Sequence, residues 1–100
     1  MVYNWIMKAV WNNAVIAESD NTIIVENNHY FPRDSVKIEF LKKSGNTYTC
    51  KWKGICDYYD VVVDGKVNQD AAWVYEEPTE PAAKIKGRFA FWRGVEVRSD

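Results

Sequence analysis

Short stretches of alternating apolar and polar residues run along most of the chain, and turn-forming residues separate them at intervals of about eight to twelve residues. Alternation with a period of two is typical of β-strands that bury one face, whereas the 3.6-residue period of amphipathic helices is nearly absent. The pattern therefore predicts an all-β single domain of antiparallel strands in a sandwich, barrel or related layered fold, with at most a short helical turn.

Three dipeptides mark the predicted hairpins: Asn12-Asn13, Asp64-Gly65 and Arg93-Gly94. Asn, Asp and Gly tolerate the positive φ of tight turns, and Asp-Gly is typical of a two-residue type I′ turn. The predicted strand pairs are 8–11 with 14–17, 60–63 with 66–68, and 88–92 with 95–98.

Further strands are predicted between these hairpins. Val36, Ile38 and Phe40 alternate with Lys37, Glu39 and Leu41. This period of two predicts a strand over residues 36–41 in which the side chains of the first three residues are buried. Residues 44–46 then predict a turn, and Gly54 is expected to end the next strand. The remaining predicted strands are 22–25, 47–53 and 71–75, and residues 78–83 are expected to form a surface connection with a short helical turn.

Composition and charge narrow the classes of function. The chain has 100 residues, which fits one domain, and its five Trp, six Tyr and four Phe predict an aromatic-rich core. A net charge of -1 gives no field to attract nucleic acid. Residues 1–10 hold one cation without a signal-type apolar run, and no apolar stretch is long enough to span a membrane. These features predict a cytoplasmic domain that binds neither nucleic acid nor a membrane.

Metal binding and disulfide formation are not expected. Cys50 and Cys56 are the two cysteines, and a reducing compartment keeps such a pair as thiols. Together with His29 they are the soft or imidazole ligands of the chain, and their spacing is not one that marks zinc sites. The sequence therefore predicts no metal and no cofactor.

Several segments occur in an order that resembles the bacterial domain of unknown function 427 family, and the resemblance covers nearly the whole chain from Met7 onward. Residues 1–6 form an N-terminal extension outside its motifs. The segments are Ala17-Glu18-Ser19-Asp20, Val25-Glu26-Asn27, Tyr30-Phe31-Pro32, Thr49 to Gly54, Tyr58-Tyr59, Ala71-Ala72-Trp73 with Tyr75 and Pro78, and Gly87 with Ala90-Phe91.

The resemblance implies two antiparallel sheets that lean together like a tent with a pocket between them, and it implies no established activity. Some classifications label the family as nucleotidyltransferase-like. That chemistry needs carboxylates that share a metal ion and a loop that holds phosphates. Asp60 and Asp64 lie about 13 Å apart along a strand, and no Gly-rich phosphate loop is present, so the motifs do not support the label.

Cys50 is a candidate nucleophile, because the nearby Lys51 and Lys53 could lower a thiol pKa. In a regular strand both lysines face away from Cys50, which then behaves as a buried apolar residue between Tyr48 and Trp52. A bulge at Gly54 would overturn this interpretation by redirecting Lys53.

The aromatic set of Tyr30, Trp52, Tyr58, Trp73, Tyr75 and Trp92 lies in or beside the family segments. Most of these rings are expected in the core, yet so many polar tips are rarely all hidden in a chain of this size, so some should line a cleft. An aromatic wall with a lysine is suited to a sugar or a heterocycle. The candidate ligand-binding residues are Tyr30, Trp52, Lys53, Tyr58, Trp73 and Tyr75.

Three functions remain open on the sequence. The first is a small-molecule or carbohydrate-type binding module, which the absence of a triad, metal cluster or carboxylate dyad favours. The second is an enzyme in which Cys50 or Lys53 reacts and Tyr58 acts as acid or base. The third is an interaction domain that forms a homodimer through exposed aromatic residues or a sheet edge.

Overall fold

A computed structural model describes residues 5–99, so residues 1–4 of the expected N-terminal extension lie outside the described part. Within it the chain forms nine strands and three 3₁₀ helices, and no α-helix is present. In chain order these are β1 (Met7–Trp11), β2 (Ala14–Ser19), β3 (Ile23–Val25), β4 (Asn28–Tyr30), η1 (Arg33–Ser35), η2 (Ile38–Phe40), β5 (Leu41–Cys50), β6 (Gly54–Val63), β7 (Lys66–Val74), η3 (Glu80–Ile85), β8 (Phe89–Phe91) and β9 (Glu96–Ser99). The predicted all-β fold is confirmed.

The largest sheet is an antiparallel meander in the order β5-β6-β7-β8. Its long β6–β7 hairpin turns at Asp64 and Gly65, whose φ angles of 51° and 76° match the predicted type I′ turn. The turn between β5 and β6 occupies residues 51–53, and Gly54 follows with φ of 107°. This conformation favours glycine, and it lets β6 begin directly beside β5.

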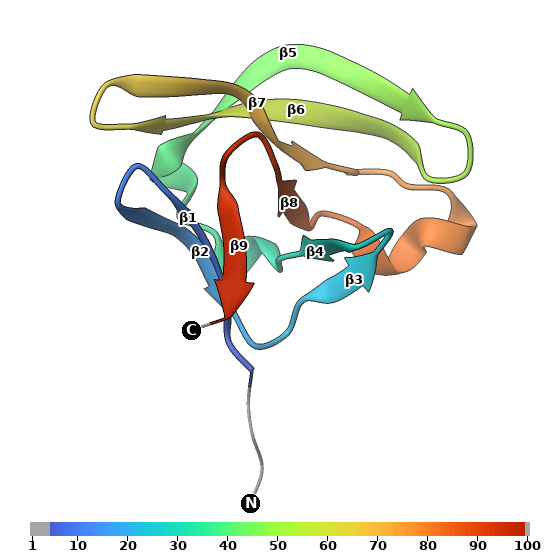
Figure 1. Ribbon diagram of the computed structural model, residues 1–100. Helices are drawn as coiled ribbons and strands as arrows, with labels where there is room; N and C mark the ends of the chain where they lie inside the picture. The colour runs from blue at the N-terminus through green and yellow to red at the C-terminus, as the bar shows by residue number, and fades with distance from the viewer. Residues whose placement is uncertain (1–4, 100) are drawn as a thin grey trace, which may run out of the picture.

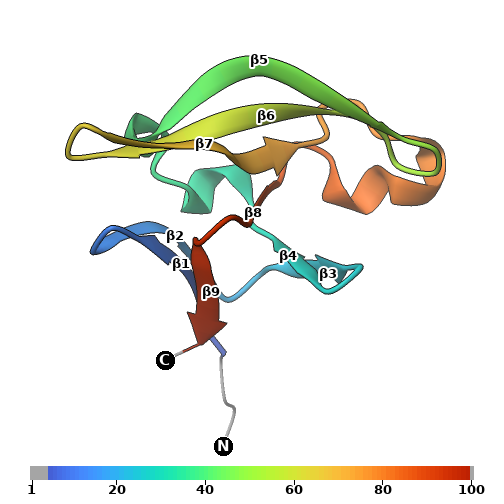
Figure 2. The same ribbon diagram turned by 45° about the horizontal axis from the view of Figure 1, so that its top comes forward.

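Two small antiparallel sheets form the opposite layer, one in the order β2-β1-β9 and the other from β3 and β4 (Figures 1 and 2). Their hairpins turn at Asn12-Asn13, as predicted, and at Glu26-Asn27, where both residues also have positive φ. The two layers agree with the tent-like expectation, and the second layer is divided into two sheets.

Strand β8 passes between the layers and divides the interior into two cores. Phe31, which follows β4, exchanges two backbone hydrogen bonds with Phe89 at 2.7 and 3.0 Å. Strand β8 is therefore also joined to the layer that the two small sheets form. Phe89 and Phe91 point into a first core between the β2-β1-β9 sheet and the large sheet, whereas Ala90 points into a second core beside β3, β4 and η3. The two faces of one strand therefore belong to two different interiors.

The strand predicted over residues 36–41 is wrong. Val36 is buried and forms a bridge with Ala17, but Ile38 is 49% exposed and begins η2. The chain has to climb here from the lower layer to the start of β5, and the 3₁₀ turn makes this change of direction (Figure 1). A period of two over a few residues does not separate a strand from such a turn.

The turn predicted over residues 44–46 is also wrong, because these residues form an irregularity inside β5. The Ser44 hydroxyl accepts a hydrogen bond from the Asn46 backbone and donates one to the Tyr58 carbonyl, and Gly45 has φ of 92°. Local side-chain hydrogen bonds and glycine thus accommodate a bulge without ending the strand. The strand predicted over residues 47–53 is the second half of β5, which ends at Cys50.

The predicted final hairpin has its turn at Arg93-Gly94, but its two arms do not pair. Strand β8 pairs with β7, and β9 pairs with β1 in another sheet. The turn, closed by a hydrogen bond from the Val95 amide to the Trp92 carbonyl at 3.2 Å, carries the chain between layers. Both arms have partners distant in sequence, which local pattern does not reveal.

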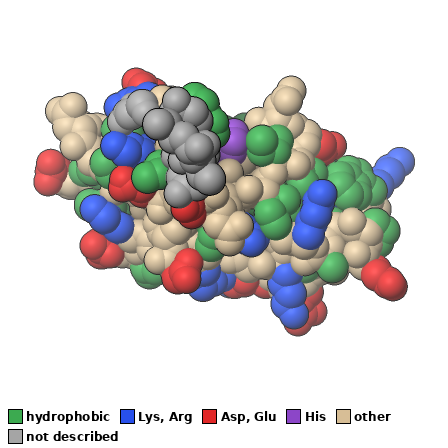
Figure 3. All heavy atoms as spheres, turned by 90° about the horizontal axis from the view of Figure 1, so that it is seen from below, with side chains coloured by type: hydrophobic (Ala, Val, Ile, Leu, Met, Phe, Trp, Pro, Cys, Tyr) green, Lys and Arg blue, Asp and Glu red, His purple; other side chains and the backbone are tan. Residues whose placement is uncertain are grey.

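Two properties of the described residues bear on partners. No helix within residues 5–99 is long and apolar enough to cross a membrane. Seen from below, basic and acidic side chains are interspersed over the visible surface, as expected for a net charge of -1 (Figure 3). This face therefore carries no extended patch of one charge sign.

Candidate functional site

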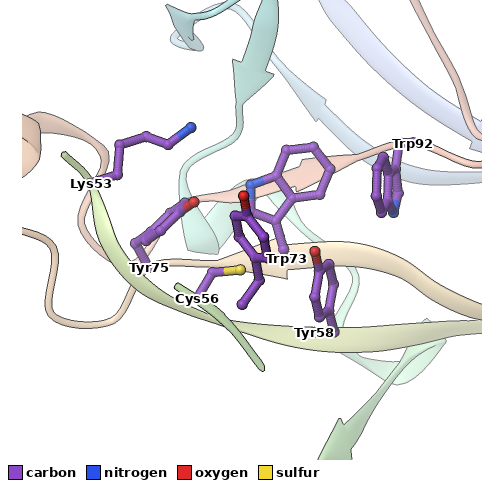
Figure 4. Close-up of a pocket in the computed structure, with 7 residues that line it drawn as sticks. Lys53, Cys56, Tyr58, Trp73, Tyr75 and Trp92 are labelled. Carbon is purple, nitrogen blue, oxygen red and sulfur yellow. The ribbon is translucent and has the colours of Figure 1, made fainter. Parts of the chain in front are cut away.

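A pocket with a cavity volume of about 100 Å³ opens beside the second core. Its lining residues come from β5, β6, β7, the β5–β6 turn and the segments after β7 and β8: Tyr48, Lys53, Cys56, Tyr58, Trp73, Tyr75 and Trp92 (Figure 4). A water molecule occupies about 30 Å³ in the liquid, so the enclosed space accepts a few waters or one small ring.

Strand alternation and register explain why these side chains meet. Cys56 and Tyr58 lie two residues apart on β6 and therefore share one face, and Trp73 shares a face with Tyr75 for the same reason. Cys56 is directly opposite Tyr48 on β5, and Tyr58 is directly opposite Trp73 on β7. The register of three adjacent strands thus brings five of the lining side chains to the same side of the sheet.

The indole rings are fixed by polar and aromatic contacts. The Trp73 Nε1–H donates to the Tyr30 hydroxyl at 3.1 Å, and the Trp92 Nε1–H donates to the Asp70 carbonyl at 2.6 Å. Trp92 stacks on Tyr58 with an angle of 7° between the planes, and it meets Trp73 edge to face at a centroid distance of 5.5 Å. The wall is therefore held in place before any ligand arrives.

An ion pair closes one end of the pocket. Lys53 is only 8% exposed, and its ammonium binds the carboxylate of Glu26 from the β3–β4 turn. The same carboxylate accepts a weak hydrogen bond from Trp52 Nε1–H at 3.4 Å. The Lys53 ammonium also lies 5.5 Å from the ring centroid of Tyr75, a cation–π contact. Lys53 thus connects the rim ion pair to the aromatic wall.

The ion pair changes the pKa values of both partners. Burial opposes the charge on Lys53, but the hydrogen bond to Glu26 and the surrounding Tyr30, Cys50 and Glu26 groups outweigh it, so its pKa is raised. The hydrogen bonds from Lys53 and then Trp52 lower the pKa of Glu26. Both groups are therefore charged at neutral pH.

Burial raises the pKa of the four neutral acidic groups in or beside the pocket, which are Tyr30, Tyr58, Tyr75 and Cys56. These phenols and this thiol stay protonated at neutral pH. The pocket therefore offers hydroxyl and thiol donors with one permanent cation.

The amino-acid sequence shows the family of this chain. The chain matches the profile of the family described as domain of unknown function DUF427, over residues 5–100. The chain belongs to the DUF427 family. No curated protein is significantly similar to this DUF427 chain. The family description carries no activity, so the site itself has to support any function.

Of the candidate ligand-binding residues in this DUF427 domain, Lys53, Tyr58, Trp73 and Tyr75 line the pocket. Tyr30 lies behind the wall, buried, and supports Trp73 through its hydroxyl. Trp52 lies on the β5–β6 turn, 42% exposed and outside the pocket lining.

Cys50, the candidate nucleophile, is partly buried against the second core and does not line the pocket, whereas Cys56 does. Lys53 is not on the outer face of a regular strand, because the turn at residues 51–53 redirects it toward the interior. The β5–β6 turn redirects Lys53, not a bulge at Gly54, where Cys50 and Gly54 pair in register, and the Lys53 ammonium binds Glu26.

The candidate list omits Tyr48, Cys56 and Trp92. Tyr48 shares its strand face with Cys50, and Trp92 belongs to the aromatic set, so both carried a signal in the sequence. Glu26 lies in a family segment and Cys56 was weighed only as a metal ligand, and neither carried a signal for this pocket, because strand register and the approach of two turns place them here.

Metal ligation has no support in the described residues. Within residues 5–99 no three His, Cys, Asp or Glu side chains form a group that could hold a metal ion. The Asp60 carboxylate accepts a hydrogen bond from the Asp70 amide at 2.9 Å, and Asp64 is a turn residue, so these two carboxylates have separate structural roles.

Proposed function

We propose that this domain is a small-molecule or carbohydrate-type binding module whose pocket holds one ring of its ligand. The observation that carries the proposal is the wall of Tyr48, Tyr58, Trp73, Tyr75 and Trp92, which ends at the buried cation of Lys53. Mostly apolar walls with a few placed polar groups are typical of small-ligand sites.

Preorganisation supports binding. Trp92 is 40% exposed, yet stacking on Tyr58 and the hydrogen bond to the Asp70 carbonyl fix its ring. An exposed aromatic ring that is already immobilised loses little conformational entropy when a ligand contacts it. Such a residue contributes to recognition more than to the stability of the fold.

The protonation states favour binding over catalysis. A general base near neutral pH needs a pKa close to the working pH, whereas the pKa of Tyr58 is raised by burial. A nucleophilic lysine needs a lowered pKa, and that of Lys53 is raised. Both groups are therefore suited to donate hydrogen bonds to a ligand.

A ligand-observed NMR screen of small ring compounds and monosaccharides tests the proposal. The expected result is a set of hits that Trp92→Ala weakens about tenfold or more, since aromatic residues dominate compact binding sites. Trp5→Ala is the matched control, because Trp5 is 71% exposed and does not line the pocket. Absence of hits, or equal weakening by both variants, would overturn the proposed function.

A further inference from the structure

The polar groups of the pocket wall are all able to donate hydrogen bonds. The lining side chains, all within residues 5–99, include three phenols, one thiol and one ammonium and no carboxylate. Both indole N–H groups are already used, by Tyr30 and by the Asp70 carbonyl. A ligand rich in hydrogen-bond acceptors can use all of these groups, whereas a donor on the ligand finds acceptors only at the phenol oxygens and, weakly, at the thiol.

The counter-ion of Lys53 comes from outside the pocket. Glu26 is exposed and lies at the tip of the two-stranded β3–β4 hairpin, whereas Lys53 is buried at the pocket end. A buried ammonium needs an anion beside it, but that anion need not be this one. If another anion occupied the position, the Glu26 carboxylate could turn into water, because the Glu26 side chain is already 51% exposed.

The position of the ammonium relative to the rings fixes where the rest of such a ligand would lie. Lys53 Nζ is 5.5 Å from the Tyr75 ring centroid, and Tyr75, Cys56 and Tyr58 continue the wall from there (Figure 4). An anionic group on Lys53 therefore places an attached ring against the aromatic wall. The cavity of about 100 Å³ limits the enclosed part to one small ring.

We propose that the ligand is an aromatic or heteroaromatic acid, a ring that carries a carboxylate or a phosphate, and that its anionic group replaces Glu26 on Lys53. This inference rests on the proposed function and names its ligand class. Glu26 acts as an internal substitute that keeps Lys53 neutralised while the pocket is empty. The exchange leaves no buried charge unpaired in either state.

The test compares three probes of one ring size: benzoate, the isosteric neutral benzamide, and phenyl phosphate, titrated into ¹⁵N-labelled protein and followed by NMR. Benzoate is expected to bind at least about tenfold more tightly than benzamide, as a charged hydrogen bond predicts. A still tighter phenyl phosphate would identify phosphate as the preferred anion, and a weaker one carboxylate; both results support the inference.

Two variants separate the roles of the ion-pair partners. Glu26→Gln is expected to raise benzoate affinity about threefold or more and to leave benzamide within about twofold, because the competing carboxylate is gone. Lys53→Met is expected to make the benzoate and benzamide affinities equal. Glu18→Gln is the matched control, because it removes the same charge from β2 in the other small sheet and should change neither affinity.

Equal affinity of benzoate and benzamide in the wild type would overturn the inference and leave the proposed function standing, since both would still bind a ring. No binding of any probe would also overturn the inference, and the ring and monosaccharide screen with Trp92→Ala would then decide the proposed function separately. Tighter binding of both probes to Glu26→Gln would show that weakening the ion pair with Lys53 opens the pocket to any ring, charged or neutral, and would likewise exclude anion exchange.

Discussion

The two cores that β8 separates are built from different side chains. The first consists of Ala, Val, Ile and Phe residues, none of which has a polar side-chain group. The second contains Tyr30, Tyr75 and Cys56 among its buried members, and Lys53 is buried at its edge. One strand, β8, contributes Phe89 and Phe91 to the first core and Ala90 to the second.

This difference assigns separate tasks to the two halves of the molecule. An interior of only apolar groups is stabilised by burial and close packing and makes no demand on hydrogen bonding. An interior with phenols, a thiol and an ammonium must satisfy each polar group, which costs stability wherever a partner is missing. The pocket lies on this second side, where the polar groups converge.

The largest expected effect is on the first core. Phe89→Ala should lower the free energy of unfolding by about 3 to 5 kcal/mol, the range for removal of a buried aromatic ring. Phe89 is fully buried and contacts the Tyr59 ring edge to face at a centroid distance of 5.2 Å. Urea denaturation measures the change, with Val67→Ala, at a position 60% exposed, as the control. A loss below about 1 kcal/mol would break the comparison.

In the second core, removal of a single hydroxyl group should lower the free energy of unfolding. Tyr30→Phe removes the acceptor of the Trp73 indole N–H, and the unsatisfied donor should cost about 1 to 3 kcal/mol. Tyr59→Phe is the control, because the Tyr59 hydroxyl makes no hydrogen bond to another residue within 5–99; its effect should stay within about 0.5 kcal/mol. Equal effects in urea denaturation would show that the hydrogen bond to Trp73 does not support the pocket.

Sequence reasoning succeeded where the signal is local. Asp64-Gly65 and Asn12-Asn13 have positive φ because Asn, Asp and Gly tolerate that conformation, and the flanking alternation is the strand pattern. Tyr58, Trp73 and Tyr75 meet because alternate residues of strands share a face, whereas the β5–β6 turn brings Lys53 to the pocket. The all-β class follows from the same periodicity.

Sequence reasoning failed where pairing is non-local. Strands β8 and β9 look like one hairpin, yet their partners are β7 and β1, and only tertiary structure chooses them. The irregularity at residues 44–46 has turn composition, but its hydrogen bonds to Tyr58 and within β5 keep it in the sheet. Glu26 reaches Lys53 across 27 residues, which no spacing rule indicates.

A smaller, pH-dependent effect is expected at the edge of the second core. Wild type should be more stable than Lys53→Met at neutral pH, because both ion-pair partners are charged there. The pKa of Glu26 is lowered from 4.5, so its contribution is present above that pH and is lost as the pH falls through the lowered value. The pKa of Lys53 is raised from 10.5, so its contribution is present below that pH and is lost as the pH rises through the raised value.

Thermal unfolding of wild type and Lys53→Met measures the difference in stability between the two proteins. The measurements should cover pH values between the pKa values of Glu26 and Lys53 and beyond each of them. Lys51→Met is the control, because Lys51 lies on the same turn but is exposed, and it should show no comparable pH dependence. A gap between wild type and Lys53→Met that stays constant as Glu26 is protonated would mean that the ion pair with Glu26 does not stabilise the second core.

The smallest expected effect is on the chemical reactivity of the Cys56 thiol, and it involves no change in the stability of the fold. Cys56 is 1% exposed and burial raises its pKa, so little thiolate forms and iodoacetamide has little access. Native protein at neutral pH should therefore be alkylated at Cys56 far more slowly than protein in urea, as mass spectrometry of the peptides would show. The partly buried Cys50 serves as the internal reference and should react first. Rapid alkylation of Cys56 in the native state would reveal an activated thiol in the pocket, and the polar half of the interior would then be a catalytic centre instead of a binding wall.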